Sequence, residues 1–498
     1  MKLPVCLLTC APLLAAICGI GLLPVAVAGS VEPVGGSRTD SVHTVQEGDT
    51  LLGLADRLLD RTDHYTPIRF VEAIRLDNGL EGDFLRLGQT LRLTLSSGPA
   101  SPVRVLPPPD EVRGIYVNAS VAGSERVVEL ARQLREVGGN AVVFDIKDRP
   151  GMLSYRSAVP LADSIRASAG APIARPRRLV EMLHREGIYV VARLTCFYDQ
   201  RLAQRRPDLV PTSRASGEPW RQRGQLCWVD PSLPEVQDYL LAIVDEVAAL
   251  GVDEIQLDYV RFPTEGNVAD AVFSFPDSVS RDQVITRFVK RVHERLPGGY
   301  TWAGPRRARS VRLSADVFGI VAWGREADLK ATGQRVADML RHLDVVSPML
   351  YPSHFYGHFE GMDVPAAYPY YFLYQGCRSL LPFARRNGVA IRPWVQAFPY
   401  RVESFDRDYI AEQIRGAEDG GAQGWLLWNS AMQYELGLGA IDDVVNGGVE
   451  AGSGRWLRHP AAPDDPALGA ADAGSKEPEQ SKPSTAGESA APLPAGGS

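Results

Sequence analysis

Residues 253–263 have the sequence DEIQLDYVRFP, and this stretch decides the fold class. Apolar side chains predominate between Ile255 and Phe262, with Gly251 shortly before the stretch and Pro263 at its end. A short, nearly continuous apolar run with such boundaries is typical of a strand that is buried on both faces. We therefore predict a strand over 254–262 within a parallel sheet.

Seven more runs of this kind occur, at 114–119, 141–147, 189–196, 311–318, 345–351, 391–397 and 424–429. Helical patterns separate them, at 125–137, 177–186, 235–250, 282–295, 333–342, 372–387 and 406–419. Eight β/α units in about 320 residues predict a (β/α)8 TIM barrel of the α/β class. A doubly wound open sheet is the alternative, but Asn118-Ala119-Ser120 follows the first run where that fold places a Gly-rich phosphate loop.

The N-terminus has the pattern of a secretory signal over residues 1–28. Lys2 precedes an apolar run, and Ala26-Val27-Ala28 matches a small-x-small cleavage site. The alternatives are a retained membrane anchor and a lipoprotein modified at Cys18. We expect a protein that is secreted, periplasmic or bound to the cell envelope and that does not remain in the membrane after cleavage.

Composition excludes some classes of function. The 498 residues carry a formal charge of −7, which argues against nucleic acid as the main partner. No Cys-x-x-Cys pair, three-His set or His/Glu set points to zinc, so we predict no metal and no cofactor. Cleavage of the signal would leave Cys196, Cys227 and Cys377, which allow either one disulfide or three buried thiols.

Residues 43–95 predict a small separate domain with the order β-α-α-β. Asp49 or Thr50 can cap a helix that begins at Leu51, and a strand over 87–93 closes the unit. The order of the elements resembles a LysM domain, and the resemblance rests on Val45, Gly48, Asp49, Thr50, Leu51, Ala55, Asn78, Gly88, Gln89 and Leu91.

The LysM resemblance implies binding of N-acetylglucosamine-containing glycans, such as peptidoglycan, through two loops. These are Gly48–Leu52 and Asp77–Gly82, so the implied ligands are Gly48, Asp49, Thr50, Leu51 and Asn78. The segment Leu59–Pro67 is longer than is usual for that family. A LysM fold kept only as a spacer is the alternative.

Two segments without core-forming patterns border the barrel domain, which we place at 111–440. Residues 96–110 are rich in Ser, Gly and Pro and predict a semi-rigid linker. Residues 452–498 consist mainly of Ala, Pro, Gly and Ser with scattered charges, which predicts a disordered tail.

Polar residues fall at the carboxyl ends of nearly all predicted strands, where TIM barrels carry their chemistry. We predict substrate-binding roles for Asp145, Lys147, Asp148, Arg193, Arg261, Tyr351, His354, Gln396, Trp428 and Asn429. Buried ion pairs at the strand ends are the alternative interpretation of the charged members.

Two acids on neighbouring strand ends, Asp258 and Asp316, can flank one scissile bond. Glycoside hydrolysis needs such a pair, one as proton donor and one ionised. We assign Asp258 as nucleophile or charge stabiliser and Asp316 as acid/base, and we expect Arg261 to keep Asp258 ionised. Ion pairing of Asp258 with Arg261 or Lys147 is the purely structural alternative.

A resemblance to a family of bacterial glycoside hydrolase domains, related to the α-amylase-like barrels, covers about 113–432. It rests on segments 114–117, 143–148, 188–193, 228–231, 253–263 and 347–352. It implies a glycosidase fold with the Asp of the fourth strand, Asp258, as nucleophile. The family 18 glucosaminidases are a poorer match, because Val260 stands where their catalytic Glu would be.

Aromatic residues near the strand ends are suited to stacking on sugar rings. The candidates are Tyr116, Phe197, Tyr198, Trp220, Trp228, Tyr259, Trp323, Tyr351, Phe355, Tyr356, Trp394, Trp425 and Trp428. The sequence thus predicts a secreted glycoside hydrolase with a polysaccharide substrate. A barrel that binds glycan without cutting it is the main alternative, and a lyase or transglycosidase is a further one.

Overall fold

The computed structural model describes residues 38–96, 109–296 and 311–447. The predicted signal peptide, nearly all of the predicted linker and the predicted tail lie outside the described residues. Among the described residues, no helix combines the length and apolar character that crossing a membrane requires.

The small N-terminal unit has the predicted β-α-α-β order. It consists of β1 (Arg38–Thr44), α1 (Leu51–Leu58), the 3-10 turn η1 (Leu59–Arg61), α2 (Pro67–Asn78) and β2 (Thr90–Ser96). The two strands are antiparallel, and Thr50 and Thr66 cap the helices through their hydroxyls. The helices pack through Leu54, Phe70 and Ile74, which are buried with the inner side chains of β2.

Eight parallel strand positions form the predicted barrel. The strands are β3 (Val112–Val117), β4 (Ala141–Lys147), β5 (Tyr189–Thr195), β7 (Glu254–Asp258), β9 (Arg312–Phe318), β10 (Val345–Met349), β11 (Ala390–Ile391), β12 (Trp394–Gln396) and β13 (Gly424–Trp428). β11 and β12 are two pieces of one position, since both pair with β10. Pro393 lies between them and has no N–H to donate. Because β9 also pairs with β10, the sheet closes on itself.

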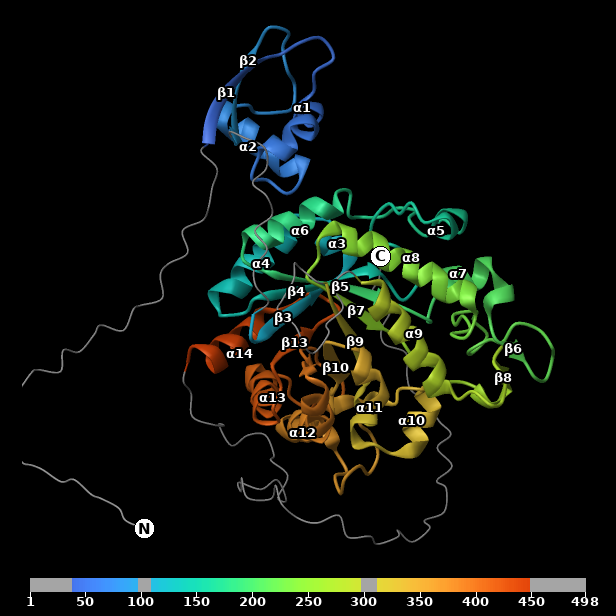
Figure 1. Ribbon diagram of the computed structural model, residues 1–498. Coiled ribbons are helices and arrows are strands. Elements are labelled where there is room, and N and C mark those ends of the chain that lie inside the picture. The colour runs from blue at the N-terminus through green and yellow to red at the C-terminus, as the bar shows by residue number, and fades with distance from the viewer. Residues whose placement is uncertain (1–37, 97–108, 297–310, 448–498) are drawn as a thin grey trace, which may run out of the picture. The chain divides into compact units, whose positions relative to one another are not determined.

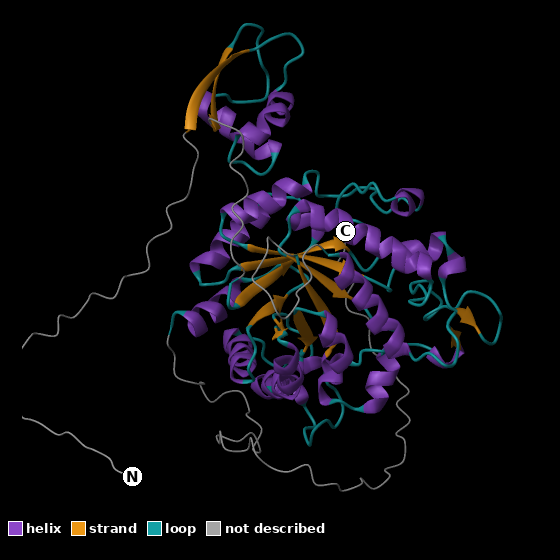
Figure 2. Ribbon diagram, viewed as in Figure 1, coloured by secondary structure: helices purple, strands orange, loops and turns teal. Residues whose placement is uncertain are grey.

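Helices surround the strands, as Figures 1 and 2 show. They are α3 (Ala119–Ala122), α4 (Arg126–Glu136), α5 (Pro160–Ser164), α6 (Pro176–Arg185), α7 (Gln200–Arg205), α8 (Pro234–Leu250), α9 (Arg281–Arg295), α10 (Glu326–Thr332), α11 (Val336–Met339), α12 (Pro369–Asn387), α13 (Arg407–Asp419) and α14 (Glu435–Val445). A short antiparallel pair, β6 (Thr212–Ser213) and β8 (Ala271–Val272), joins two of the loops.

Strand alternation determines which side chains enter the barrel. Along β4, Val142 and Phe144 pack in the large outer core, whereas Val143 belongs to a separate interior cluster with Tyr116 and Trp394. Asp145 lies two residues after Val143 and therefore faces the same interior. The alternation of side chains along each strand therefore determines which polar residues near the strand ends face the barrel interior.

The three cysteines that follow the predicted signal are all free and buried, so the structure favours three thiols over a disulfide. Burial raises the pKa of the Cys196 and Cys377 thiols well above its ordinary value. These thiols therefore behave as small apolar side chains.

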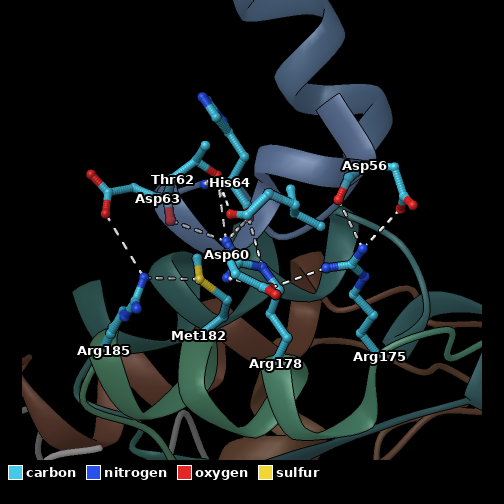
Figure 3. A network of polar contacts seen from close by, with 10 residues as sticks. Asp56, Asp60, Thr62, Asp63, His64, Arg175, Arg178, Met182 and Arg185 are labelled. Atoms are coloured by element: carbon cyan, nitrogen blue, oxygen red, sulfur yellow. Dashed lines mark hydrogen bonds and ion pairs between the residues drawn. The ribbon is translucent and has the colours of Figure 1, made fainter. Parts of the chain in front are cut away.

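Polar contacts join α6 to the segment that links the two helices of the small unit (Figure 3). Arg178 is buried and donates to the backbone carbonyls of Thr62 and His64. Arg175 contacts Asp56 at 2.9 Å and Asp60 at 3.0 Å. The segment Leu59–Pro67 thus supplies backbone acceptors to a barrel helix.

Candidate active site

Arg193 lies at the centre of the polar strand ends. This residue of β5 contacts Asp145 through Nη1 at 2.5 Å and contacts Asp258 through Nη2. Its Nε lies 3.7 Å from Asp316 Oδ2. All four side chains are buried, with Asp316 only 1% exposed. The Arg193 guanidinium therefore lies beside three carboxylates, each from a different strand. Arg193, which we predicted as a substrate-binding residue, is at the centre of this group of acids.

Asp258 ends β7 and accepts two hydrogen bonds from charged or backbone donors. Besides Arg193, the N–H of Tyr259 donates to Oδ1 at 2.5 Å. Tyr259 has φ +49°, a left-handed backbone that non-glycine residues rarely adopt. Such strain is often found at functional sites, and here it turns the chain away immediately after the carboxylate.

Asp316 lies two residues before the end of β9, in a different environment. The indole Nε1–H of Trp394 donates to its Oδ1 at 2.7 Å. Burial, followed by the negative charge of Asp258, raises the pKa of Asp316 well above its usual range, although Arg193 and the Trp394 hydrogen bond act in the opposite direction. The register pairs Leu257 with Ala315, so the two acids follow on neighbouring strands. The site thus favours the protonated form of Asp316 beside Asp258.

Asp145 is the third acid of the group. The hydroxyl of Tyr116 donates to its Oδ2 at 2.5 Å. The Tyr116 ring stacks on Trp428 with 4.0 Å between centroids, and the Arg193 guanidinium lies 4.9 Å from the Trp428 ring. Burial raises the pKa of Asp145, and Arg193 opposes the shift. Trp428 is half-buried, so its indole is the part of this layer that is open to solvent.

Arg261 does not perform the predicted role of pairing with Asp258. Arg193 makes that contact, and the Arg261 guanidinium instead lies over the rings of Phe318, Trp228 and Tyr259. The reason is geometric, since Arg261 follows the left-handed turn at Tyr259 and leaves the strand before its side chain can reach back.

Lys147, which we predicted as a substrate ligand, has protein partners for its ammonium group. It is fully buried, and its ammonium contacts Asp199 at 2.9 Å and donates to the Thr195 carbonyl at 2.7 Å. The register between β4 and β5 shifts between Asp145 and Lys147, which gives the two side chains different partners. Asp199, which the sequence did not single out, is the counter-charge.

Two other predicted ligands, Gln396 and Asn429, contact the backbone of nearby loops. Gln396 donates to the carbonyls of Phe398 and Tyr400, and Asn429 donates to those of Ala397 and Gln433. These amides hold the loops after β12 and β13.

Asp148 closes a turn by accepting the N–H of Met152 at 2.7 Å. Burial raises its pKa to about 6. The Asp148 carboxylate therefore stabilises this turn and is not one of the three carboxylates beside Arg193.

Tyr351 and His354 follow β10 as predicted. Tyr351 is buried, and its ring lies 5.0 Å from the exposed His354. Phe398 lies against both rings, at 5.6 Å from Tyr351 and 6.1 Å from His354. These three rings form a second aromatic surface near the strand ends.

The predicted aromatic residues separate into three groups. Tyr116, Trp394 and Trp428 surround the acids, and Tyr198, Trp228 and Tyr259 contact one another beside Arg261. The third group lies elsewhere: Phe197, Trp220, Trp323, Phe355 and Trp425 pack against other core residues, Tyr351 contacts His354, and Tyr356 is exposed.

The residues implied as glycan ligands in the small unit differ in their exposure and in their partners. Leu51 is 1% exposed and packs in the core of the unit. Asp49 contacts Arg57 and His43, each at 2.8 Å. The N–H of Gln46, then Arg57 and His43, lower its pKa. Gly48 and Thr50 are exposed in the turn before α1.

Asn78 joins α2 to β2 instead of facing a ligand. Its Nδ2 donates to the carbonyls of Ile74 and Arg92, each at 2.8 Å, and its Oδ1 accepts the Arg92 N–H at 2.7 Å. The amide nitrogen and oxygen of Asn78 therefore both have backbone partners within the small unit.

Replacing Asn78 by Ala should destabilise the small unit by about 1–2 kcal/mol, because three hydrogen bonds are lost at a partly exposed site. Hydrogen exchange in the full chain should show faster exchange of the Arg92 amide. Asn387→Ala, which removes a single exposed hydrogen bond to the Phe383 carbonyl, is the matched control. Unchanged exchange at Arg92 in Asn78→Ala would contradict this role.

Across the three described ranges, no group of three or more His, Cys, Asp or Glu residues is arranged to hold a metal ion. The arrangement offers buried carboxylates, one guanidinium and aromatic faces. Such groups can transfer protons and stabilise positive charge at a sugar carbon.

Comparisons with known proteins identify a domain family. No curated protein matches the chain. Among solved structures, a hypothetical protein from Ruminiclostridium thermocellum is 32% identical, covers 41% of this chain and 97% of its own length, and has a TM-score of 0.34. The spore cortex-lytic enzyme SleL of Bacillus cereus is 12% identical over 80% of this chain and 85% of its own, with a TM-score of 0.36.

A GH20 exo-β-N-acetylglucosaminidase from Vibrio harveyi is 10% identical over 71% of this chain and 56% of its own, with a TM-score of 0.41. Similarity at this level does not extend the activities of these proteins to this chain. The family model is decisive, because it matches residues 114–434, more than half of the chain and nearly the whole barrel. The chain therefore belongs to the domain family DUF4015, described as "Putative glycosyl hydrolase domain".

Proposed function

We propose that the protein hydrolyses glycosidic bonds in a cell-wall or extracellular polysaccharide. The observation that carries the proposal is the pair of acids on neighbouring strand ends with opposite environments. Asp258 contacts the Arg193 guanidinium, and Asp316 is buried with a raised pKa. A carboxylate beside a carboxylic acid is the combination that glycoside hydrolysis requires.

In the proposed mechanism, Asp316 donates its proton to the glycosidic oxygen as the bond to the sugar carbon breaks. Asp258 attacks that carbon or stabilises its developing positive charge. A water molecule then supplies the hydroxyl of the new reducing end, and the other proton of that water molecule restores the protonated form of Asp316. Arg193 provides the positive charge that an ionised Asp258 needs in a buried site.

The other residues around Arg193 have supporting roles in this mechanism. Trp394 orients Asp316 through its indole N–H, and Tyr116 orients Asp145 through its hydroxyl. The half-buried face of Trp428 offers a stacking surface for a sugar ring.

The small unit is proposed to hold the enzyme on glycans that contain N-acetylglucosamine, in the manner of LysM domains. Attachment to the polymer would raise the local concentration of substrate. The support comes from the exposed apolar side chains near the two implied loops, since Leu52 is 56%, Phe84 82% and Leu87 76% exposed. We also propose that the protein acts outside the cytoplasm, on the basis of residues 1–28.

Replacing Phe84 by Ser should weaken retention on insoluble peptidoglycan or chitin about 3- to 10-fold, because one exposed aromatic face is lost. Co-sedimentation of the full chain with each polymer measures this effect. Ile68→Ser removes another exposed apolar side chain, 67% accessible but at the start of α2, at the opposite end of that helix from the Asp77–Gly82 loop, and should not change retention. Equal retention of wild type and Phe84→Ser would contradict binding through this loop.

A non-catalytic glycan-binding barrel is the second candidate. It is favoured by the ion pair between Asp258 and Arg193 and by the low exposure of both acids, 4% for Asp258 and 1% for Asp316. In that case the carboxylates would organise the barrel rather than react.

Incubating the purified full chain with peptidoglycan, chitin, α-glucans and acidic exopolysaccharides tests the proposal. We expect new reducing ends from at least one polymer, increasing linearly with enzyme concentration. Binding to a polymer without release of reducing ends from any of them would favour the second candidate.

A further inference from the structure

Arg261 is a buried cation without a carboxylate partner. Its side chain is 4% exposed, and its Nη1 donates to the backbone carbonyl of Phe262 at 2.9 Å. Within the part of the chain that the structure describes, no Asp or Glu forms an ion pair with this guanidinium. Burial lowers the pKa of Arg261, which reflects the cost of holding a charge away from water.

Aromatic rings surround this guanidinium and leave its remaining donors unused. The Arg261 Cζ lies 4.0 Å from the Phe318 ring centroid, 4.9 Å from that of Trp228 and 5.2 Å from that of Tyr259. Ring faces attract a cation but accept no in-plane hydrogen bonds from Nε and Nη2. The rings therefore hold the guanidinium in place, and among the described residues its Nη1 donates to the Phe262 carbonyl.

The position of Arg261 connects it with the acids of the proposed mechanism. It follows Asp258 by three residues, and Phe318 follows Asp316 by two at the end of β9. Arg261 thus lies at the ends of the two strands that carry the proposed catalytic pair, on the side of Tyr259 and Trp228. A sugar unit next to the cleaved bond would meet it there.

A second guanidinium lies in the same aromatic group. Arg149 is exposed in the loop after β4, and its Cζ lies 5.3 Å from the ring of Tyr198, which itself contacts both Trp228 and Tyr259. The charge of Glu265 acts on both arginines, and its carboxylate accepts the Gln222 amide at 3.2 Å. The two arginines of this aromatic group therefore outnumber the one acid whose charge acts on both of them.

We infer that Arg261 binds a carboxylate on the sugar unit beside the cleaved bond, and hence that the substrate is an acidic polysaccharide containing uronate units. Guanidinium and carboxylate match in a planar, two-fold hydrogen-bonded geometry, whereas a neutral sugar hydroxyl cannot supply the missing negative charge. Arg149 adds a second, exposed cation that the same polysaccharide chain can contact. The inference rests on the proposed function, because it places the carboxylate relative to Asp258 and Asp316.

The test measures binding separately from cleavage. Full-length Asp258→Asn protein is titrated calorimetrically with oligosaccharides from polygalacturonate and from hyaluronan. Each is compared with its carboxyl-reduced derivative, in which the carboxylate has become a hydroxymethyl group. We expect at least one acidic oligosaccharide to bind about 10- to 100-fold more tightly than its reduced counterpart, and added salt to weaken the acidic one.

Arg261→Gln in the same background should remove most of this preference and leave binding of the reduced oligosaccharide unchanged. Arg281→Gln is the matched control, since Arg281 also lies on two rings, those of Phe262 and Phe273, but away from the acids. If Arg261→Gln unfolds, the exposed variant Arg149→Gln provides the readout, with an expected loss of about 3- to 10-fold.

Equal binding of acidic and reduced oligosaccharides, no binding of either, or an unchanged preference in the variants that fold would overturn the inference. Hydrolysis of neutral glycans without any carboxylate preference would overturn it and leave the proposed function intact. Carboxylate-dependent binding without hydrolysis of any polymer by the wild type would support it and refute the hydrolase mechanism.

Discussion

Asp258→Asn should abolish glycan hydrolysis, with a loss in kcat on the order of 10⁴-fold. The amide cannot act as nucleophile and carries no negative charge to stabilise a cationic sugar. Arg193 keeps its contact with Asp145 in the variant, so the fold should survive. Initial rates of reducing-end release by wild type and variant, on the polymer that the wild type degrades, measure the effect.

Asp270→Asn is the control for this experiment. Asp270 accepts from Ser213 and from the backbone of Ala215 in the loop pair β6–β8, away from the strand ends, so the activity of the variant should match that of the wild type. An Asp258→Asn enzyme that retains a tenth or more of the wild-type rate would exclude Asp258 as the reacting carboxylate.

Arg193→Met should cost about 3–5 kcal/mol in unfolding free energy at pH 8, because three buried carboxylates lose their shared cation. The pKa values of Asp145 and Asp316 are already raised by burial, and removing Arg193 should raise both further. Between the ordinary Asp pKa of about 4 and these raised values, the folded state binds more protons than the unfolded state. The free energy of unfolding therefore increases as the pH falls through that window. Because the variant has the larger increase, the difference in unfolding free energy between wild type and Arg193→Met should become smaller toward pH 5.

Urea unfolding of wild type and Arg193→Met at pH 8 and pH 5 tests this expectation. Arg295→Met removes an exposed guanidinium that contacts Asp245 at 2.7 Å, and it should cost less than about 1 kcal/mol at both pH values. A cost for Arg193→Met that is the same at both pH values would show that the three acids do not depend on this cation.

The barrel could be predicted from the sequence because its strands are buried on both faces and so stand out as apolar runs. The run at 141–147 coincides with β4, and that at 189–196 is one residue longer than β5. The predicted strand 254–262 is too long, since β7 ends at Asp258. The left-handed turn at Tyr259 ends it, and nothing in the composition of DYVRF signals that turn.

Which polar residues reach the site was harder to predict, because strand ends also carry groups that hold loops. Arg193 and Asp145 follow the strand period into the barrel, as the pattern implies. Lys147 lies two residues beyond Asp145, but a register shift sends it to Asp199. The amides of Gln396 and Asn429 bind backbone carbonyls of their own loops, and a single sequence does not distinguish such contacts from substrate contacts.

The small unit shows the same limit. Its β-α-α-β order follows from hydrophobic periodicity and helix caps, both of which are local. The role of Asn78 depends on Arg92, fourteen residues away, and that of Leu51 on burial against the other elements of the unit. Contacts between residues that are distant in the sequence leave no local pattern to detect.

Cleavage of the degraded polymer in ¹⁸O-labelled water, with mass spectrometry of the products, tests the central claim that Asp258 and Asp316 hydrolyse a glycosidic bond. The account predicts one ¹⁸O at each new reducing end with the wild type and no product with Asp258→Asn or Asp316→Asn. Products without ¹⁸O, or labelled products in equal amounts from the wild type and both variants, would contradict it.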